Sequence, residues 1–377
     1  MSEATGKTEK RRPRKAKASA GAQSIARYAT MDDVAAAAGV HPTTVSMALR
    51  AHPSIPPATR ERILAEARRI GYVRDPLLDA FNFHRLSKLA ARQSPSIAFV
   101  VDSNSAPYFF GSPYHPLVWE GVRAVAESQH LTVEVFPLGT KDMTPSRLNT
   151  IISSRGISGI LLSTFTPATK AIDLDWDNYS AVKIESHHLL PQHDIVSSDQ
   201  CQVARLCMTK LRERGYRRIG LATARDDESR LQDNFSSGVL VEQASMPESE
   251  CVPPLLFERT DIATIAAQVV EWIREYKVDA LMSNWHELLT LDPDGRGSRL
   301  STTTFRIPQE VAYASLDAPS NCAHMGGIVQ NHRLVGMRAL EQLSVLVRTY
   351  QRGAPKNPSA TYVPGYWQEG PTVPWKT

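Results

Sequence analysis

The sequence predicts two kinds of structure in one chain. A small all-α N-terminal domain has a tight turn between its first two helices, and a larger α/β body has two lobes with doubly wound parallel sheets. Three observations predict this division. Apolar residues recur with helical spacing over residues 30–72, and from residue 96 onward short β-branched apolar runs alternate with helical segments. Basic residues are concentrated before residue 96, and the remainder is acidic.

The size and composition of the chain limit its class. Its 377 residues suffice for two or three domains, and 42% apolar residues are ample for sizeable cores. No apolar run approaches the roughly 18 residues that cross a bilayer, and the N-terminus lacks the apolar segment of a signal peptide. We therefore expect a cytoplasmic protein with no membrane partner. The cysteines show no metal-ligand doublet, and we expect buried free thiols at Cys201, Cys207, Cys251 and Cys322.

The net charge of +4 conceals an asymmetry. Residues 1–95 hold 17 Lys and Arg against 8 Asp and Glu, a local charge of +9, which leaves residues 96–377 at −5. A basic end on an acidic body indicates a polyanionic partner for that end. The densest basic run, KTEKRRPRKAK at residues 7–17, predicts a disordered tail over residues 1–29. This tail either contacts phosphates loosely or only aids solubility.

The first helix is predicted from its cap. Thr30 precedes an apolar-periodic segment and Asp33 follows three residues later. The Thr30 hydroxyl can accept a hydrogen bond from the Asp33 N–H, and the acid favours the positive end of the helix. Val34, Ala35 and Ala38 then share one face, which we expect to be buried.

The second helix follows at once. Gly39 can take the left-handed conformation that ends a helix, and Pro42 suits the first position of the next one. Val45, Ala48 and Leu49 give the second helix an apolar stripe. Its remaining side chains carry little charge and are suited to close approach to base edges: Thr43, Thr44, Ser46 and Met47.

A third helix fits residues 57–72, with Ile63, Ala67 and Ile70 inward and Gly71 past its end. Three short helices with a tight turn between the first two form a helix-turn-helix unit. By pattern alone, a small three-helix bundle with no role in DNA binding fits as well.

Residues 30–81, TMDDVAAAAGVHPTTVSMALRAHPSIPPATRERILAEARRIGYVRDPLLDAF, resemble the N-terminal domain of the lactose-repressor (LacI/GalR) family, which typically opens T-x-x-D-V-A-x-x-A-G-V-S-x-x-T-V-S-R-x-L-N. The resemblance implies that the second helix enters the major groove of operator DNA. Thr43, Thr44 and Met47 are then expected to face bases, and Arg50 a phosphate or the groove edge. The full set of expected DNA contacts is Thr30, His41, Pro42, Thr43, Thr44, Ser46, Met47 and Arg50.

The N-terminal domain departs from the family pattern at four positions. His41 stands where the family usually has a helix-capping Ser, and Pro56 replaces a Ser that would cap the third helix. Met47 replaces a usual Arg, and Arg50 a usual Asn. The fold tolerates these changes, but the base preference changes with them, because Arg donates hydrogen bonds to guanine and Met cannot.

Residues 74–96 resemble the family's hinge helix, N-P-L-A-x-x-L, followed by a polar connector. The resemblance implies that paired hinge helices of a homodimer enter the minor groove, with an apolar wedge between base pairs. Phe81 is the expected wedge, and Leu77 and Leu78 are expected to pack across the dimer. Alternatively, Phe81 packs onto the body. We assign residues 30–75 to the helix-turn-helix domain and 76–95 to the hinge helix and linker.

The body, residues 96–377, shows the alternation that predicts parallel sheets covered by helices on both sides. Ligands in such folds bind at the carboxyl ends of the strands. The expected strands are SIAFVVD, GILLS, AVKIES, RIGLAT, DALMSN and VAYASLD, and the expected helices include residues 116–129, 199–214, 262–276 and 333–351.

The resemblance continues more weakly through the body. PYFF at residues 107–110 stands where the family has N-P-F-F, residues 194–223 resemble the D-x-V-x-x-D-N segment with its helix and strand, and residues 304–317 resemble G-L-R-V-P-E-D-V-S-V-V-G-F-D. This implies a periplasmic-binding-protein-like body with a central cleft, closed by a small polar effector, a sugar or sugar derivative.

Family contact positions carry over in part. Asp199 matches the acidic residue of D-N, with Gln200 in place of Asn, and Arg230 matches an effector-contacting Arg, one residue further from Phe235 than usual. Asn284 matches the Asn of a usual N-D pair whose acid is replaced by Trp285. Each polar side chain could instead cap a strand end or join the lobes as a salt bridge. The expected effector contacts are Tyr108, Phe110, Asp199, Arg230, Asn284, Trp285 and Asp317.

Catalytic, cofactor and metal motifs are absent from the sequence. There is no G-x-G-x-x-G after a strand, no P-loop, no H-E-x-x-H and no G-x-S-x-G. Residues 285–308 hold a loop where the family has a long helix, and the DPDG within it is read as a plain turn. The eleven histidines show no metal-ligand spacing, and His187 and His188 would face opposite sides of a strand.

The sequence therefore predicts an effector-responsive, homodimeric DNA-binding regulator, a repressor on a palindromic operator. One alternative keeps DNA binding but leaves the body only to dimerise, because Gln200 and Trp285 alter the cleft. The other is a transport sugar-binding protein or an α/β enzyme with an accidental N-terminal bundle. The sequence shows neither the secretion signal expected of a transport protein nor the catalytic constellation expected of an enzyme.

Overall fold

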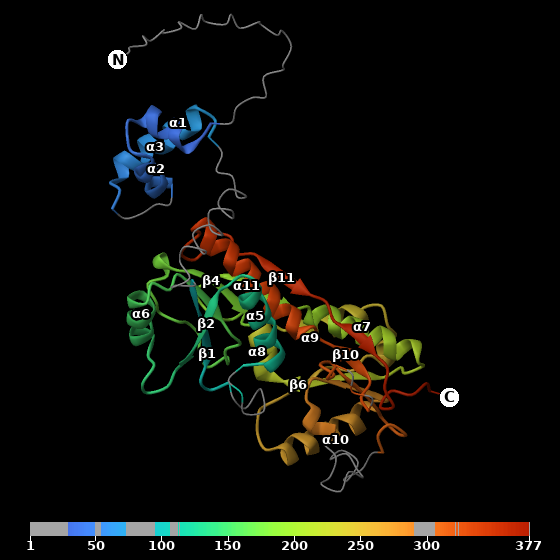
Figure 1. Cartoon of the computed structure of the whole chain (residues 1–377). Helices are drawn as coiled ribbons and strands as arrows, with labels where there is room; N and C mark the ends of the chain where they lie inside the picture. The colour runs from blue at the N-terminus through green and yellow to red at the C-terminus, as the bar shows by residue number, and fades with distance from the viewer. Residues whose placement is uncertain are drawn as a thin grey trace, which may run out of the picture. The chain divides into compact units, whose positions relative to one another are not determined.

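The computed structural model describes residues 29–49, 54–72, 95–105, 112, 114–289, 306–320, 322 and 324–376. These residues fall into two compact units, 29–72 and 95–376, which are described separately (Figure 1). Several predicted positions lie outside the described residues: the tail before residue 29, Arg50, Leu77, Leu78, Phe81, Tyr108 and Phe110.

The first unit contains three described helices, α1 (Met31–Ala38), α2 (Pro42–Leu49) and α3 (Pro57–Arg69). The predicted cap of α1 is confirmed: the Asp33 N–H donates to the Thr30 hydroxyl at 3.3 Å, and the Thr30 N–H donates to the Asp33 carboxylate at 2.7 Å. Gly39 ends α1 in the left-handed conformation, at φ 62°. Pro56 gives α3 no side-chain cap.

The predicted core of the first unit is confirmed in the main, except that Leu49 and Ile70 are only partly buried and that Ile55, which was not predicted, is buried. Helix α3 ends at Arg69, so Ile70 caps it and packs partly buried against the core. The buried side chains come from all three helices and the α2–α3 connection: Val34, Ala35, Ala38, Val45, Ala48, Ile55, Ile63 and Ala67.

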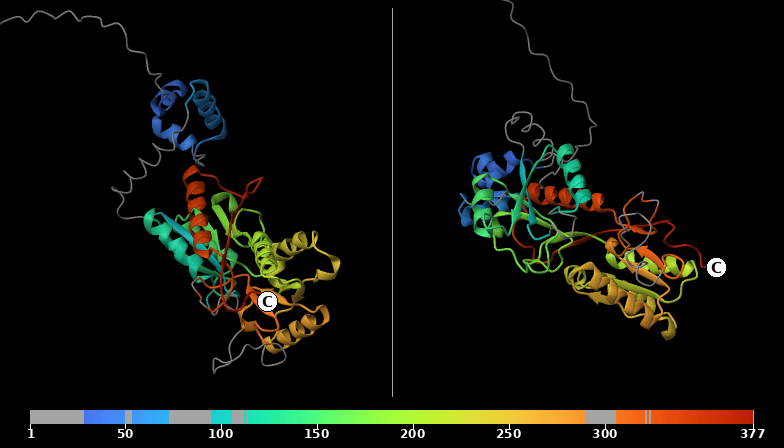
Figure 2. Two further views of the ribbon diagram at one scale, coloured as in Figure 1. Left: turned by 90° about the vertical axis from the view of Figure 1, so that its right-hand side faces the viewer. Right: turned by 90° about the horizontal axis from the view of Figure 1, so that it is seen from below.

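The second unit, the body, has two α/β lobes, as the sequence predicts (Figure 2). In lobe 1, all six described strands are parallel, in the order β11-β5-β4-β3-β1-β2. Their bounds are β1 Ser96–Asp102, β2 Thr132–Leu138, β3 Gly159–Leu162, β4 Ser180–Ile184, β5 Asp194–Ser198 and β11 Ala360–Val363. Helices α5 (Pro116–Ser128) and α11 (His332–Thr349) pack into the core on one face of this sheet, and α6 (Pro145–Ser154) into the core on the other.

The described strands of lobe 2 have the order β12-β10-β9-β8-β6-β7, and of these only the edge strand β12 runs antiparallel to its neighbour. The bounds are β6 Ile219–Ala224, β7 Leu255–Phe257, β8 Ala280–Ser283, β9 Ala312–Ser315, β10 Gly327–Val329 and β12 Tyr366–Gln368. Helices α7 (Gln200–Glu213) and α9 (Asn234–Gln243) share one core, α10 (Ile262–Tyr276) covers the other face, and α8 (Arg225–Leu231) follows β6. Short 3-10 turns occur at Trp176–Asn178, Glu248–Glu250 and His286–Leu289.

In the described part of the body, the chain passes between the lobes three times. It leaves lobe 1 after β5 to enter α7, returns from β10 into α11, and crosses again from β11 to β12. Each lobe is therefore assembled from segments distant in sequence. At each crossing the chain leaves the carboxyl end of a strand. This is the end at which proteins of this fold class bind ligands.

Two sequence expectations need correction. His187 and His188 do not lie on a strand; they form a turn after β4 has ended at Ile184. All four cysteines are free, but only Cys207 is buried, and Cys201, Cys251 and Cys322 are partly exposed. Among the described residues, no helix combines the length and apolarity needed to cross a membrane.

We expect Gly336→Ala to destabilise lobe 1. Helices α5 and α11 touch backbone to backbone: a Cβ on Gly121 would lie 2.0 Å from the Arg333 carbonyl oxygen, and one on Gly336 would lie 2.0 Å from the Val118 carbonyl oxygen. The helices must separate to admit a methyl group, which should cost about 1–3 kcal/mol. Chemical unfolding measures this, with exposed Arg123→Ala on α5 as a control that should stay within about 0.5 kcal/mol. If Gly336→Ala has the same free energy of unfolding as the parent chain, the close contact between the two helices is contradicted.

We expect His193→Phe to reduce the acid sensitivity of lobe 1. His193 is 1% exposed, and neither ring nitrogen has a hydrogen-bond partner among the described residues. Burial, and then the nearby Lys183, lower the pKa of His193 from 6.5 to about 4. The unfolded chain takes up this proton near pH 6.5, so the folded state loses stability as pH falls from 6.5 toward 4.

Phenylalanine keeps the ring beside Trp176, whose centroid is 4.5 Å from that of His193, and removes the titration. The free energy of unfolding, measured in urea at pH 7 and pH 5, should fall less for His193→Phe than for the parent chain. The difference should be up to about 1.4 kcal/mol per pH unit. His130→Gln, at an exposed histidine, is the control. If His193→Phe and the parent chain lose stability equally on acidification, burial of the His193 ring is not the cause.

Candidate functional site

The outer face of α2 is the first candidate site. Val45 and Ala48 are buried, whereas Thr43 is exposed and Thr44 and Ser46 are partly exposed. Met47, the remaining predicted base contact on this helix, is partly buried and packs against the three-helix core. The exposed part of α2 therefore carries hydroxyl groups and no charge.

His41 caps α2, which the sequence did not predict. The Thr43 N–H donates to Nδ1 of His41 at 3.3 Å, and the Thr43 hydroxyl lies 2.9 Å from the same nitrogen. The imidazole thus takes the role that the Ser would have in the family pattern. Both side chains, with Pro42 between them, lie at the N-terminal end of α2, the end that contacts bases in helix-turn-helix proteins.

The second candidate site is a cavity of about 840 Å³ lined by residues from both lobes of the body. Arg230, Asn284, Trp285 and Asp317, four of the predicted effector contacts, line it. Asp199 does not: its carboxylate accepts the Gln202 N–H at 3.0 Å and caps the N-terminus of helix α7, a role that was not predicted from the sequence.

Asp227 organises the lobe 2 side of the cavity. Its carboxylate accepts hydrogen bonds from Arg259 at 2.9 Å, from Asn284 at 3.0 Å and from the Trp285 indole at 3.3 Å, and Arg230 lies 3.4 Å away. Burial on its own would raise the pKa of Asp227, but Arg259 and Arg230 outweigh it and the pKa is lowered. One buried carboxylate therefore orients two guanidinium groups, an amide and an indole ring.

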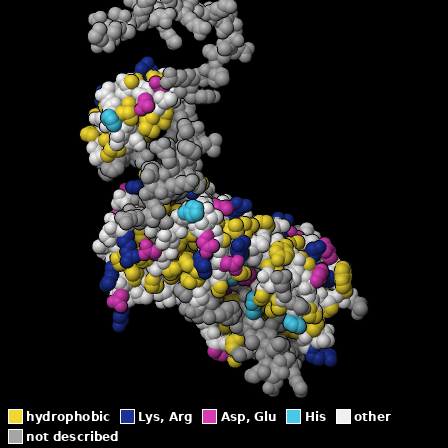
Figure 3. All heavy atoms as spheres, in the orientation of Figure 1, with side chains coloured by type: hydrophobic (Ala, Val, Ile, Leu, Met, Phe, Trp, Pro, Cys, Tyr) yellow, Lys and Arg dark blue, Asp and Glu magenta, His cyan; other side chains and the backbone are white. Residues whose placement is uncertain are grey.

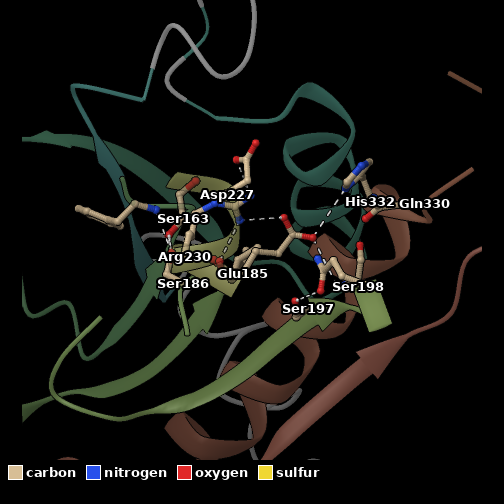
Figure 4. Close-up of polar contacts among 12 residues, drawn as sticks. Ser163, Glu185, Ser186, Ser197, Ser198, Asp227, Arg230, Gln330 and His332 are labelled. Atoms are coloured by element: carbon tan, nitrogen blue, oxygen red, sulfur yellow. Dashed lines mark hydrogen bonds and ion pairs between the residues drawn. The ribbon is translucent and has the colours of Figure 1, made fainter. Parts of the chain in front are cut away.

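Glu185 organises the lobe 1 side. It follows β4 with a left-handed backbone, at φ 49°, which only surrounding contacts can hold in a non-glycine residue. Its backbone carbonyl accepts a hydrogen bond from Arg230 at 3.0 Å, and its carboxylate lies 3.7 Å from the same guanidinium and 3.9 Å from Nδ1 of His332. Figure 4 shows the carboxylate between these two cations. Burial would raise the pKa of Glu185, but His332 and Arg230 lower it.

Two histidine rings pack against each other beside Glu185, with an interplanar angle of 30°. His332 begins α11 and its Nε2 lies 2.9 Å from the Asp317 carboxylate; burial would lower its pKa, but Asp317 raises it to about 9. His115 caps α5 by accepting the Leu117 N–H at Nδ1, and its ring centroid is 3.9 Å from that of His332. Burial, and then His332, lower the pKa of His115 to about 4. At neutral pH one ring is therefore charged and the other neutral.

The histidines show no metal-ligand spacing along the chain, because His115 and His332 are far apart in sequence. The fold brings both beside Asp317. Glu185, Asp227, Arg259, His115 and His332 were not predicted as site residues. For Glu185 a signal existed, because it lies near the carboxyl end of the predicted strand AVKIES, where ligands bind in this fold class.

Basic and acidic side chains are interspersed over the face of the body shown in Figure 3. A polyanion therefore has no broad single-sign surface to bind on that face. The cavity between the lobes mixes charges too, with carboxylates, guanidinium groups and an aromatic ring. Such a cavity suits a small polar molecule with several hydrogen-bonding groups.

The N-terminal domain matches a known protein family, and longer segments of the chain are similar in sequence to bacterial regulators. Residues 30–75 match the model of the family described as "Bacterial regulatory proteins, lacI family". The NTD biosynthesis operon regulator NtdR of Bacillus subtilis (strain 168) is 25% identical over 198 residues, covering 51% of this chain and 54% of that protein. The HTH-type transcriptional regulator CelR of Thermobifida fusca is 29% identical over 136 residues, covering 36% of this chain and 37% of that protein. The matches thus span about half the length of NtdR and less of CelR.

Solved structures share the fold over most of the chain. The complex of the transcriptional regulator CelR with cellobiose has a TM-score of 0.52 at 20% identity, covering 90% of this chain and 98% of that one. The Lac repressor dimer bound to operator and the anti-inducer ONPF also has a TM-score of 0.52, at 16% identity, covering 92% of this chain and 100% of that one. The two-lobed body is therefore periplasmic-binding-protein-like, as the sequence predicts. The helix-turn-helix domain, residues 30–75, is therefore of the lacI family of bacterial regulatory proteins, and the rest of the chain shares the fold of LacI-type regulators.

Proposed function

We propose that the protein is a sequence-specific DNA-binding regulator that binds a palindromic operator as a homodimer. The observation that carries this proposal is the N-terminal domain: a capped α1, a left-handed Gly39 and an uncharged outer face of α2 within a match to the lacI family model. A regulator of this type acts in the cytoplasm, where its DNA is, and has no catalytic role. The dimer and operator of the Lac repressor neighbour support the same assembly here.

We further propose that the protein is a repressor whose cavity binds a sugar or sugar derivative. The cavity has room for a mono- or disaccharide, and it presents planar hydrogen-bonding groups and the Trp285 ring, as sugar sites do. The cellobiose complex of CelR supports this class of effector. The alternative, a body that only dimerises, is less consistent with a cavity whose polar lining is held in place by Asp227 and Glu185.

We expect Thr44→Ala to weaken operator binding by about 1–3 kcal/mol, the range for one base contact. Thr44 is partly exposed on the outer face of α2, so its replacement should leave the fold intact. The operator is first selected from a random DNA pool, and affinity is then measured by fluorescence anisotropy. Thr132→Ala, an exposed threonine on β2 of the body, is the matched control and should bind like the parent chain. Equal operator affinity for the two variants would remove Thr44 from the interface.

We expect Trp285→Leu to weaken effector binding at least tenfold, because leucine offers no flat face for a sugar ring and cannot donate to Asp227. A panel of sugars and sugar derivatives is screened by thermal shift on the full chain, and the affinity of a hit is measured by calorimetry. Trp375→Leu, at a tryptophan 67% exposed and outside the cavity lining, is the control. A panel that produces no thermal shift would favour the body that only dimerises.

A further inference from the structure

Three metal-ligating groups meet at one edge of the cavity. His115, Asp317 and His332 each offer one donor atom, and these atoms lie within 4.8 Å of one another. We propose that they form a binding site for a divalent first-row transition-metal ion, with Zn²⁺ as the reference ion. All three residues line the cavity, so the ion would have an open position facing it. This inference does not depend on DNA binding or on a sugar effector.

The donor set fits such an ion better than it fits Mg²⁺ or Ca²⁺. Two imidazoles and one carboxylate form the ligand set of zinc sites that keep an open position, whereas Mg²⁺ and Ca²⁺ take oxygen ligands. With bonds of about 2.0–2.2 Å, two ligands of one ion lie about 3–3.5 Å apart. Nε2 of His332 and the Asp317 carboxylate are already 2.9 Å apart, so the main movement falls on the His115 side chain; the ion replaces the Nε2 proton of His332, which is released to solvent.

Glu185 supplies the outer partner that a metal-bound histidine needs. Nδ1 of His332 is buried and has no hydrogen-bond partner among the described residues, and the Glu185 carboxylate faces it at 3.9 Å. A ligating histidine almost always donates its second ring N–H to a carboxylate, carbonyl or water, which fixes the ring and raises its basicity. Glu185 is itself held by Arg230 and by the Ser198 N–H at 3.3 Å.

His115 must change its hydrogen bonding to bind the ion. Its Nδ1 accepts the Leu117 N–H at 3.2 Å. Coordination through Nδ1 replaces this bond directly, and coordination through Nε2 moves the ring proton to Nδ1, which removes the acceptor. In either case the Leu117 N–H loses its hydrogen-bond acceptor. The helix tolerates this, because the N–H groups of the first turn of a helix have no intrahelical partner. The Leu117 amide is therefore a specific reporter of coordination.

The ligands come from both lobes. Asp317 follows β9 in lobe 2, His115 caps α5 in lobe 1, and His332 begins α11 at a crossing between the lobes. A bound ion would therefore join the lobes at the cavity edge and stabilise the folded body by mass action. A chelating oxygen group of a cavity ligand could fill the open position.

The experiment uses the full chain after treatment with a chelator. Co²⁺ is titrated and followed by visible absorption, Zn²⁺ is titrated by calorimetry, and Mg²⁺ serves as the negative ion. We expect one Co²⁺ or Zn²⁺ per chain and a Zn²⁺-dependent rise in melting temperature. His332→Gln and Asp317→Asn should lose at least tenfold in affinity, while His130→Gln, at an exposed histidine outside the cluster, should bind like the parent chain.

Glu185→Gln is the second variant, because it keeps all three ligands and the size of the side chain; we expect a loss of about 10–100-fold in Zn²⁺ affinity. Each variant's melting temperature without metal shows whether it is folded. A parent chain that binds no Zn²⁺ at 100-fold molar excess overturns the proposal, as does a folded His332→Gln or Asp317→Asn variant with parental affinity. Operator binding is measured separately on metal-free protein, so failure of the metal site and failure of the proposed regulator are distinguishable.

Discussion

The buried carboxylate of Glu185 is the interaction on which the arrangement of the two lobes depends. A charge removed from water is tolerated only where other charges and hydrogen bonds replace the water. For Glu185 these come from Arg230 in lobe 2, from His332 at a crossing, and from the backbone of Ser198. Asp227 then holds the other side of Arg230. Glu185 of lobe 1 and Arg230 of lobe 2 are thus paired between the lobes, so moving the lobes apart would leave the buried Glu185 carboxylate without its lobe 2 cation.

The sequence predicted well what depends on neighbouring residues. The Thr30–Asp33 cap, the stop at Gly39 and the start at Pro42 are each decided within four residues, and the structure confirms them. The strands quoted from the body are confirmed to within about two residues at their ends, since each is a mostly apolar run that is buried along its length. Six described strands were not among those quoted: β2, β5, β7, β10, β11 and β12. Strand β2, for example, lies at the sheet edge, and its alternating, partly exposed residues lack a continuous apolar signal.

The candidate sites were less predictable, because their members are joined only by the fold. Nothing near His332 in sequence indicates that it meets Asp317, Glu185 and His115. Asp199 shows the opposite error: its local pattern matched a contact position, yet its carboxylate caps α7 and lies outside the cavity lining. The role of His41 was missed since imidazole is an uncommon cap, although its position before Pro42 is the position of a cap. Predictions for Arg50, Phe81, Tyr108 and Phe110 concern residues outside the described ranges.

The three crossings between the lobes have a consequence for protein synthesis. The ribosome makes most of lobe 1 first, but β11, which pairs with β5, follows the whole of β6 to β10 and α11. Until residue 363 has been made, the β5 edge of the lobe 1 sheet has no neighbour, and an unpaired edge strand invites association with other chains. Lobe 2 waits in the same way for β12. A nascent chain thus cannot finish one lobe before starting the other, and the two must mature together near the end of translation.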